Sequence, residues 1–226
     1  MIKNNNNIEY KFLSIISMVS VSLLIVAMIL TYRPIEIWMF LTPGGVIPFS
    51  STYVIAGIVS EVYSFRNAKR LIIGNFICIF VFNIMMTLML KIPTINVANN
   101  DMYVAIFNNS LYTMLMYSFG FLLGDLINAF CISKWSILTN GKYFITRLIG
   151  ASVIGQIFFS IVVIPMLYAA NSDLHIFFRQ FTTTILAKIL IIVLLSYPGK
   201  IIKKLLIRAE NIHNNEQRII FNPFSS

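Results

Sequence analysis

Residues 12–32, FLSIISMVSVSLLIVAMILTY, contain no charged side chain. A helix of about 20 mostly apolar residues crosses the hydrocarbon core of a lipid bilayer. The run is longer than the apolar core of a secretory signal peptide, and no small-residue cleavage site follows it. We therefore expect residues 12–32 to form an uncleaved first membrane-spanning helix, preceded by a polar tail over residues 1–11.

The composition of the whole chain also indicates a membrane protein. Of the 226 residues, 58% are apolar and 11% are charged, and the mean hydropathy is +0.83. An ordinary soluble domain is about 45–50% apolar and about 25% charged, and a soluble globule of this size cannot bury so much apolar surface. The composition excludes a soluble enzyme, a disordered protein and a disulfide-rich scaffold. It predicts an all-α integral membrane protein.

Five further apolar runs follow the first, and none contains more than one charged residue. They cover residues 37–60, 71–90, 102–130, 148–170 and 180–199. Together with residues 12–32 they predict a six-transmembrane-helix bundle over residues 12–200. The second run is interrupted by Pro43, Gly44, Gly45 and Pro48, which disfavour helix. Either this helix begins near Pro48, or residues 42–48 form a discontinuous segment that lines a cavity.

The lysine and arginine residues gather in one set of predicted loops. With both termini cytoplasmic, thirteen of the 17 positive residues lie inside, three lie outside and Lys188 lies within the sixth run. This bias is typical of membrane proteins, whose cytoplasmic loops are rich in lysine and arginine. It predicts a multi-pass protein of the cell inner membrane with cytoplasmic termini and a basic tail over residues 201–226. It also accounts for the net charge of +9 without a nucleic-acid partner. The inside residues are Lys3, Lys11, Arg66, Lys69, Arg70, Lys134, Lys142, Arg147, Lys200, Lys203, Lys204, Arg208 and Arg218.

Charged residues at or within the predicted helices need a partner or a role. Such a side chain at the centre of a membrane helix costs about 2.5–3.5 kcal/mol on insertion scales. Lys188 lies midway along the sixth run, and we expect it to face the bundle interior and to pair with Glu61 or Asp125. Glu61 itself follows the second run. It is either an interfacial residue paired with a nearby cation or a substrate or proton site.

Three further polar positions bear on a binding site. Asp125 and Asn128 lie three residues apart and share one helix face, and Gly120 and Gly124 precede Asn128 at a spacing that allows close approach of another helix. This group is either a packed helix contact or part of a substrate site. Gln156 offers amide donors and an acceptor, which suit a nucleobase-like edge or a helix–helix hydrogen bond.

The candidate substrate-binding residues are therefore Glu61, Asp125, Asn128, Gln156 and Lys188. The sequence contains no P-loop, zincin or nucleophile-elbow motif. Its two cysteines and two histidines are not clustered as metal ligands. We therefore expect no catalytic residues, no metal site and no cofactor, and we do not expect an enzyme.

Residues 49–70, FSSTYVIAGIVSEVYSFRNAKR, resemble a signature of the VUT family, the queuosine precursor transporters. In that signature a proline–phenylalanine stretch is followed by a helix ending in S-E-V-Y-G and then by a basic A-R/K pair. The stretches GDLINAFCISKW (124–135) and RLIGASVIGQ (147–156) resemble two further blocks of the family. Lys188, Tyr197 and Pro198 resemble its last helix. The resemblance covers about residues 49–200 and implies a six-helix importer of queuosine precursors, which are neutral 7-deazaguanine compounds.

Three positions depart from the family pattern. The family usually has aspartate where this chain has Gly57, Asn128 and Phe159, whereas Asp125 replaces a usual glutamine. A carboxylate can accept hydrogen bonds from the N–H pair of a guanine edge, and glycine or phenylalanine cannot. The chain therefore resembles a diverged member, whose substrate can differ from the usual deazaguanine.

The leading hypothesis is a membrane transporter that imports a small planar metabolite, a queuosine precursor, by facilitated or ion-coupled transport. One alternative is the substrate-binding membrane subunit of an ATP-driven vitamin importer of the energy-coupling factor type, which would dock through small residues of the first helix. Another is a diverged paralogue that does not transport. Expected partners are a small-molecule substrate and the lipid bilayer, with a homodimer as an open option and no nucleic acid.

Overall fold

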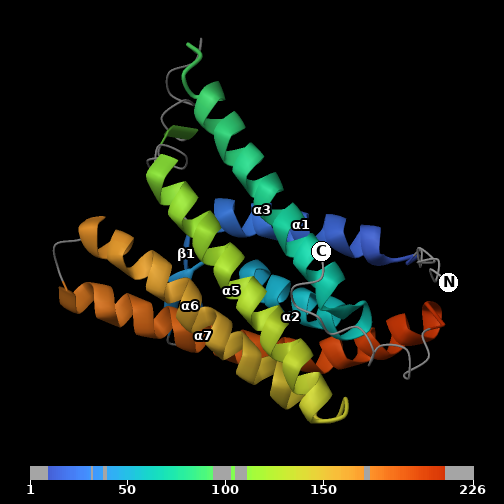
Figure 1. Ribbon diagram of the computed structural model, residues 1–226. Helices are drawn as coiled ribbons and strands as arrows, with labels where there is room; N and C mark the ends of the chain where they lie inside the picture. Colours follow the sequence, from blue (N-terminus) through green and yellow to red (C-terminus); the bar gives the residue numbers. More distant parts are fainter. Residues whose placement is uncertain are drawn as a thin grey trace.

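The computed structural model describes residues 10–31, 33–37, 40–93, 103–104, 111–170 and 174–211. Within these ranges, six long helices and one two-stranded hairpin form a helical bundle (Figure 1). The strands are β1 (Pro34–Ile37) and β2 (Phe40–Pro43). The helices are α1 (Leu13–Leu30), α2 (Val46–Val62), α3 (Ser64–Met89), α5 (Leu111–Leu138), α6 (Phe144–Ala170) and α7 (Leu174–Ala209).

Five of these helices are long and apolar enough to cross a membrane, so the protein is an all-α membrane protein. They are α1, α3, α5, α6 and α7. The remaining helix, α2, has 17 residues, which corresponds to about 26 Å at 1.5 Å per residue. Its apolar surface faces other helices, because thirteen of its residues are buried.

The second predicted span, residues 37–60, is wrong in its first part. Residues 40–43 form β2, which pairs antiparallel with β1 so that Pro34 lies opposite Pro43. The helix begins only at Val46, close to the interpretation in which it starts near Pro48. Glycine is required at the turn between them, because a Cβ atom at Gly45 would collide with the carbonyl oxygen of Ala27 on α1.

Other helix boundaries also differ from the predicted ones. The helix predicted over residues 102–130 is observed as α5, which ends eight residues later at Leu138. Residues 105–110 lie outside the described residues, as do residues 1–9 and 212–226 of the two predicted tails. The sixth span, predicted over residues 180–199, continues as α7 to Ala209, so the C-terminal tail starts later than predicted.

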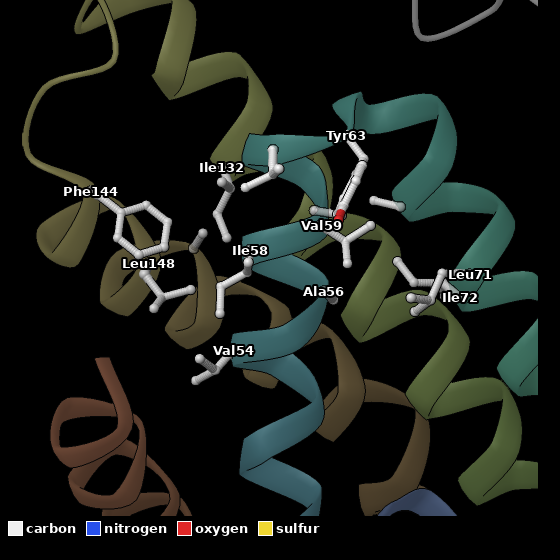
Figure 2. Packing of buried hydrophobic residues seen from close by; sticks show 14 residues of the cluster. Val54, Ala56, Ile58, Val59, Tyr63, Leu71, Ile72, Ile132, Phe144 and Leu148 are labelled. Atoms are coloured by element: carbon white, nitrogen blue, oxygen red, sulfur yellow. The ribbon is translucent and has the colours of Figure 1, made fainter. Parts of the chain in front are cut away.

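The central element of the bundle is α2. It packs against α1, α3, α5, α6 and α7. Figure 2 shows its side chains Val54, Ile58 and Val59 among residues from the neighbouring helices. A helix that is buried over most of its surface is expected to lack a broad polar face, and α2 is exposed only along the stripe that begins at Ile47.

The helices α5 and α6 run side by side and form the most extensive contact of the bundle (Figure 1). Their backbones meet at two glycines: a Cβ atom at Gly155 would lie 2.5 Å from the carbonyl oxygen of Gly124. A Cβ atom at Gly120 would meet Val163 at 2.9 Å. The close approach predicted from the Gly120 and Gly124 spacing is therefore confirmed.

One end of the bundle, which we call the polar end, brings together three helix termini. The carboxylate of Glu210, which follows α7, accepts hydrogen bonds from the backbone N–H groups of Lys11 and Phe12 at 3.1 and 2.9 Å. It also accepts one from the Tyr63 hydroxyl at 2.9 Å. The start of α1, the end of α2 and the end of α7 therefore lie at the same end of the molecule.

Candidate functional site

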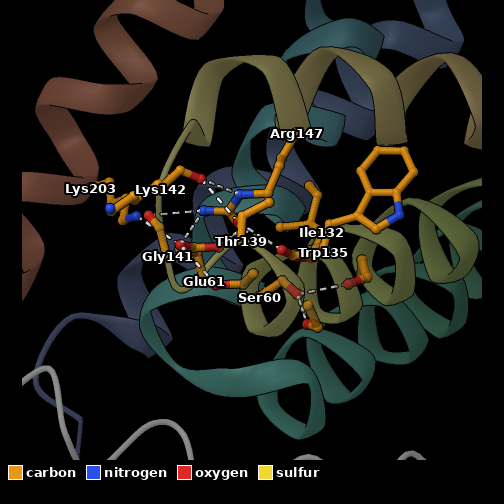
Figure 3. A network of polar contacts seen from close by, with 12 residues as sticks. Ser60, Glu61, Ile132, Trp135, Thr139, Gly141, Lys142, Arg147 and Lys203 are labelled. Carbon is orange, nitrogen blue, oxygen red and sulfur yellow. Dashed lines mark hydrogen bonds and ion pairs between the residues drawn. The ribbon is translucent and has the colours of Figure 1, made fainter.

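A buried ion-pair cluster lies at the polar end and is centred on Glu61 (Figure 3). Its two carboxylate oxygens accept hydrogen bonds from the two terminal nitrogens of Arg147, both at 2.8 Å. Lys203 on α7 approaches the same carboxylate at 2.8 Å, and the Ser136 hydroxyl donates to it at 3.2 Å. Of the two interpretations of Glu61, the structure shows the pairing with cations.

Arg147 is held in place by the connection between α5 and α6. Its Nε donates to the carbonyl oxygen of Lys142 at 2.9 Å, and its terminal nitrogens reach the carbonyl oxygens of Gly141 and Ile132 at 3.3 and 3.4 Å. Because every arm of the guanidinium is engaged and the side chain is 3% exposed, Arg147 cannot move without breaking several bonds. The cluster thus fixes α2, α6 and α7 relative to one another.

A cavity of about 890 Å³ opens beside the ion-pair cluster. It lies between α7, the end of α5 and the first turn of α6. Its lining includes four serines, namely Ser60, Ser64, Ser133 and Ser136. Basic residues from one face of α7 complete the lining, namely Lys200, Lys203, Lys204 and Arg208.

A second group of buried and partly buried residues lies inside the bundle, and we call it the central polar cluster; its members are Asp125, Asn128, Gln156 and Lys188, together with the aromatic residues Phe49, Tyr53 and Phe159. The Lys188 ammonium lies 4.3 Å from the ring centroid of Phe49 and 4.4 Å from that of Phe159. Such contacts are favourable because the ring face carries negative charge. The expected pairing of Lys188 with Glu61 or Asp125 is not what the structure shows, since Glu61 binds Arg147 and Lys203 instead.

Asp125 is fully buried on α5, and neither of its carboxylate oxygens has a hydrogen-bond partner among the described residues. The hydroxyl of Tyr53 on α2 is equally buried and without a partner there. It packs against Gly124, the residue before Asp125. A buried polar group without a partner costs about 1–3 kcal/mol, so two of them in neighbouring positions need an explanation.

Asn128 and Gln156 extend the central polar cluster. The Asn128 amide donates to the backbone oxygen of Tyr53 at 3.1 Å and accepts from the Ser152 hydroxyl at 3.3 Å. Asn128 therefore joins α2, α5 and α6 as a helix contact. Gln156 is buried on α6, and it lies one turn from both Ser152 and Phe159 on the same helix face.

The five predicted site residues thus divide between two levels of the bundle. Asp125, Asn128, Gln156 and Lys188 belong to the central polar cluster, whereas Glu61 is eight residues beyond Tyr53 on α2, or about 12 Å along the helix. Tyr53 and Phe49 were missed as site residues, because an aromatic residue in an apolar run looks like ordinary core. Their spacing of four residues, which places them on one helix face, was the available signal.

The comparisons with known proteins agree with a transport role. The family model described as "Putative vitamin uptake transporter", that of the VUT family, matches residues 43–199, which is more than half of the chain. The matched range includes all five predicted site residues. It also includes the central polar cluster and every residue of the ion-pair cluster except Lys203. No curated protein and no solved structure matches the chain.

Proposed function

Because the chain belongs to the VUT family of vitamin uptake transporters, we propose that it imports a small planar metabolite, a queuosine precursor of the 7-deazaguanine type, by facilitated or ion-coupled transport. The observation that carries the proposal is the fully buried Asp125 carboxylate, which has no partner among the described residues. A guanine-type edge presents adjacent N–H donors that such a carboxylate accepts. The substrate would thereby supply the missing hydrogen bonds.

The rest of the central polar cluster supports recognition of a planar ring. Phe49 and Phe159 lie with their ring centroids 5.2 Å apart, next to the Lys188 ammonium. Aromatic rings stack on flat ligands, and the ammonium and the Tyr53 hydroxyl can donate to a carbonyl oxygen of the ligand. The proposed substrate site therefore combines Asp125 as acceptor, Tyr53 and Lys188 as donors, and the two rings, which contact each other, as one aromatic side.

We further propose that α2 also crosses the membrane, which brings the number of crossings to six. The membrane is the inner membrane, and both termini are cytoplasmic. The polar end supports this topology, because α1 begins there and α2 and α7 end there. An even number of crossings returns the chain to its starting side. Lys11, Lys142, Lys200 and Lys203 belong to segments at this end, as expected for a cytoplasmic face.

The test is uptake in cells that lack queuosine synthesis and their own importer. Cells expressing the chain receive a low concentration of precursor, and queuosine is then measured in their tRNA. We expect restored queuosine with the unchanged chain and at least a tenfold loss with Asp125→Asn, at equal protein in the membrane. Glu36→Gln is the matched control, since it makes the same chemical change at an exposed carboxylate of β1. No queuosine with the unchanged chain refutes the substrate, and equal uptake by Asp125→Asn refutes the site.

The energy-coupling alternative requires small residues on an open face of α1. Of the five small residues on this helix, Ser14 and Ser22 are exposed, whereas Ser20 and Ala27 are buried against the bundle. Ser20 accepts a hydrogen bond from Asn75 of α3 at 2.8 Å. Only part of the small-residue pattern is thus open to a partner. Uptake that persists after removal of the host's energy-coupling ATPases separates a self-sufficient transporter from this alternative.

A further inference from the structure

The cavity at the polar end has a basic lining that the transport of a neutral precursor does not require. Lys200, Lys203, Lys204 and Arg208 recur at spacings of three and four residues, so they share one face of α7. Lysine and arginine are common on cytoplasmic surfaces for topological reasons alone. Their gathering on one face around a cavity is the feature that needs a further explanation.

The positive charge of this lining is only partly balanced. Among the described residues the only carboxylate in the cavity is Glu61, and both Arg147 and Lys203 already pair with it. No ion pair involves Lys200, Lys204 or Arg208 within the described part of the chain. These three exposed cations therefore surround a space that still lacks negative charge.

Neutral groups of the lining are also hydrogen-bond donors that suit an anion. The lining includes Ser64 and the first turn of α6, which begins at Phe144, whereas the hydroxyls of Ser60, Ser133 and Ser136 already bond to protein groups. The first N–H groups of a helix have no partner within it and favour negative charge. Ammonium, guanidinium, hydroxyl and helix N–H donors together are the set that binds a phosphate group.

The neighbouring face of the same helix segment is apolar and exposed. Ile201, Ile202 and Leu205 are 62%, 48% and 57% exposed, and on a helical wheel they form the face next to the cations, with Ile201 adjacent to Arg208. Tyr197, one turn earlier, is 69% exposed, and tyrosine is enriched at the membrane interface. An apolar face beside a basic one suits acyl chains next to a headgroup, which favours a lipid over a phosphate dissolved in water.

We propose that the cavity between the end of α7 and the α5–α6 connection binds the phosphate headgroup of an anionic membrane lipid through Lys200, Lys204 and Arg208. The lipid's chains lie along the apolar face of α7. Lys203 is reserved for Glu61, and its ammonium also lies 4.6 Å from the ring centroid of Phe144. This proposal does not depend on the identity of the transported substrate.

The test uses the full chain purified in neutral detergent and an equimolar mixture of phosphatidylglycerol and phosphatidylcholine. Bound lipid is counted by native mass spectrometry. We expect the unchanged chain to retain phosphatidylglycerol with about a hundredfold preference, since each cation near an anionic surface contributes about 1 kcal/mol. The triple variant Lys200→Gln, Lys204→Gln, Arg208→Gln should lose this preference.

The matched control is Arg66→Gln, Lys69→Gln, Arg70→Gln, which removes three exposed cations of α3 that do not line the cavity. It should retain the preference. An equal loss in both triple variants, or no preference in the unchanged chain, overturns the proposal. Displacement of the lipid by inorganic phosphate at equal concentration shows a free-phosphate site and overturns the lipid as occupant.

If the first triple variant does not fold, the single variant Lys204→Gln replaces it. Lys204→Gln should still lower the preference for phosphatidylglycerol severalfold, and an unchanged preference refutes the site.

Discussion

Glu61 on α2 and Arg147 on α6 form a bidentate ion pair, with both nitrogen–oxygen distances at 2.8 Å. The two side chains are only 5% and 3% exposed. They are 86 residues apart in the sequence, so the pair joins two helices that have no local reason to meet. A buried charge that loses its partner is costly, and this gives the pair a measurable role in stability.

Replacement of Glu61 by leucine should therefore destabilise the protein. It leaves Arg147 and Lys203 without their shared carboxylate, and breaking such a buried pair costs about 3–5 kcal/mol. Thermal unfolding in detergent measures the loss. Adding Arg147→Leu to Glu61→Leu should recover part of it, because the uncompensated guanidinium is then gone. Strictly additive losses from the two substitutions would contradict this account, and Glu36→Gln should have little effect.

Ser64→Gly should stabilise the junction between α2 and α3. Ser64 has a φ of +77°, which a residue with a Cβ atom rarely adopts. Left-handed backbone costs such a residue about 1–2 kcal/mol, and glycine removes this cost. Part of the resulting gain in stability is offset by the greater entropy of glycine in the unfolded chain. We expect a gain of about 1 kcal/mol in unfolding free energy. The family signature places glycine at this position, and a lower melting temperature for Ser64→Gly would refute the strain.

The effect of Phe159→Asp on stability should depend on Lys188. The substitution restores the acidic residue that the family pattern has at this position, next to an ammonium now 4.4 Å from the Phe159 ring. Alone, it should be tolerated because a new ion pair forms. Combined with Lys188→Met, it leaves a buried carboxylate without a partner and should be more destabilising than the sum of the single substitutions. A double-mutant cycle of unfolding midpoints measures this coupling, and additivity would show that the two positions do not interact.

Gly124→Ala should weaken the contact between α5 and α6. The new Cβ atom would lie 2.9 Å from the carbonyl oxygen of Gly155 and would collide with the Tyr53 hydroxyl. Overpacking of this kind costs about 1–3 kcal/mol. Gly74→Ala is the control, because a Cβ atom there meets nothing within 4 Å and alanine is the better helix former by about 1 kcal/mol. The two variants should shift the melting temperature in opposite directions.

Acid should weaken the contact of Glu210 with the start of α1. Partial burial raises the pKa of Glu210, but hydrogen bonds from the Phe12 and Lys11 backbone and from Tyr63 outweigh it and hold the pKa below the ordinary value of 4.5. A lowered pKa in the folded state stabilises the protein above pH 4.5, and this stabilisation is lost as the pH falls through the lowered value. Melting temperatures of the unchanged chain and Glu210→Gln should therefore converge below pH 4.5. A constant difference would contradict this role.

The membrane class and most of the helices follow from the sequence. Uninterrupted apolar runs of about 20 residues have few stable conformations other than helix in a lipid bilayer, so α1, α3, α5, α6 and α7 were expected near their observed places. The close contact at Gly124 also follows from local spacing. The sequence left two alternatives for the start of the second helix. Proline and glycine disfavour helix there, but they do not specify the hairpin that precedes it.

The tertiary structure decided which polar residues meet. Lys188 was expected to pair with a carboxylate, but its ammonium lies over the rings of Phe49 and Phe159, while Glu61 pairs with Arg147 and Lys203. Sequence patterns report the face of a helix on which a residue lies, because they reflect one helix at a time. They do not report how helices are rotated and shifted against each other. That arrangement comes from side-chain packing across the bundle, and it separates the central polar cluster from the ion pair at the polar end.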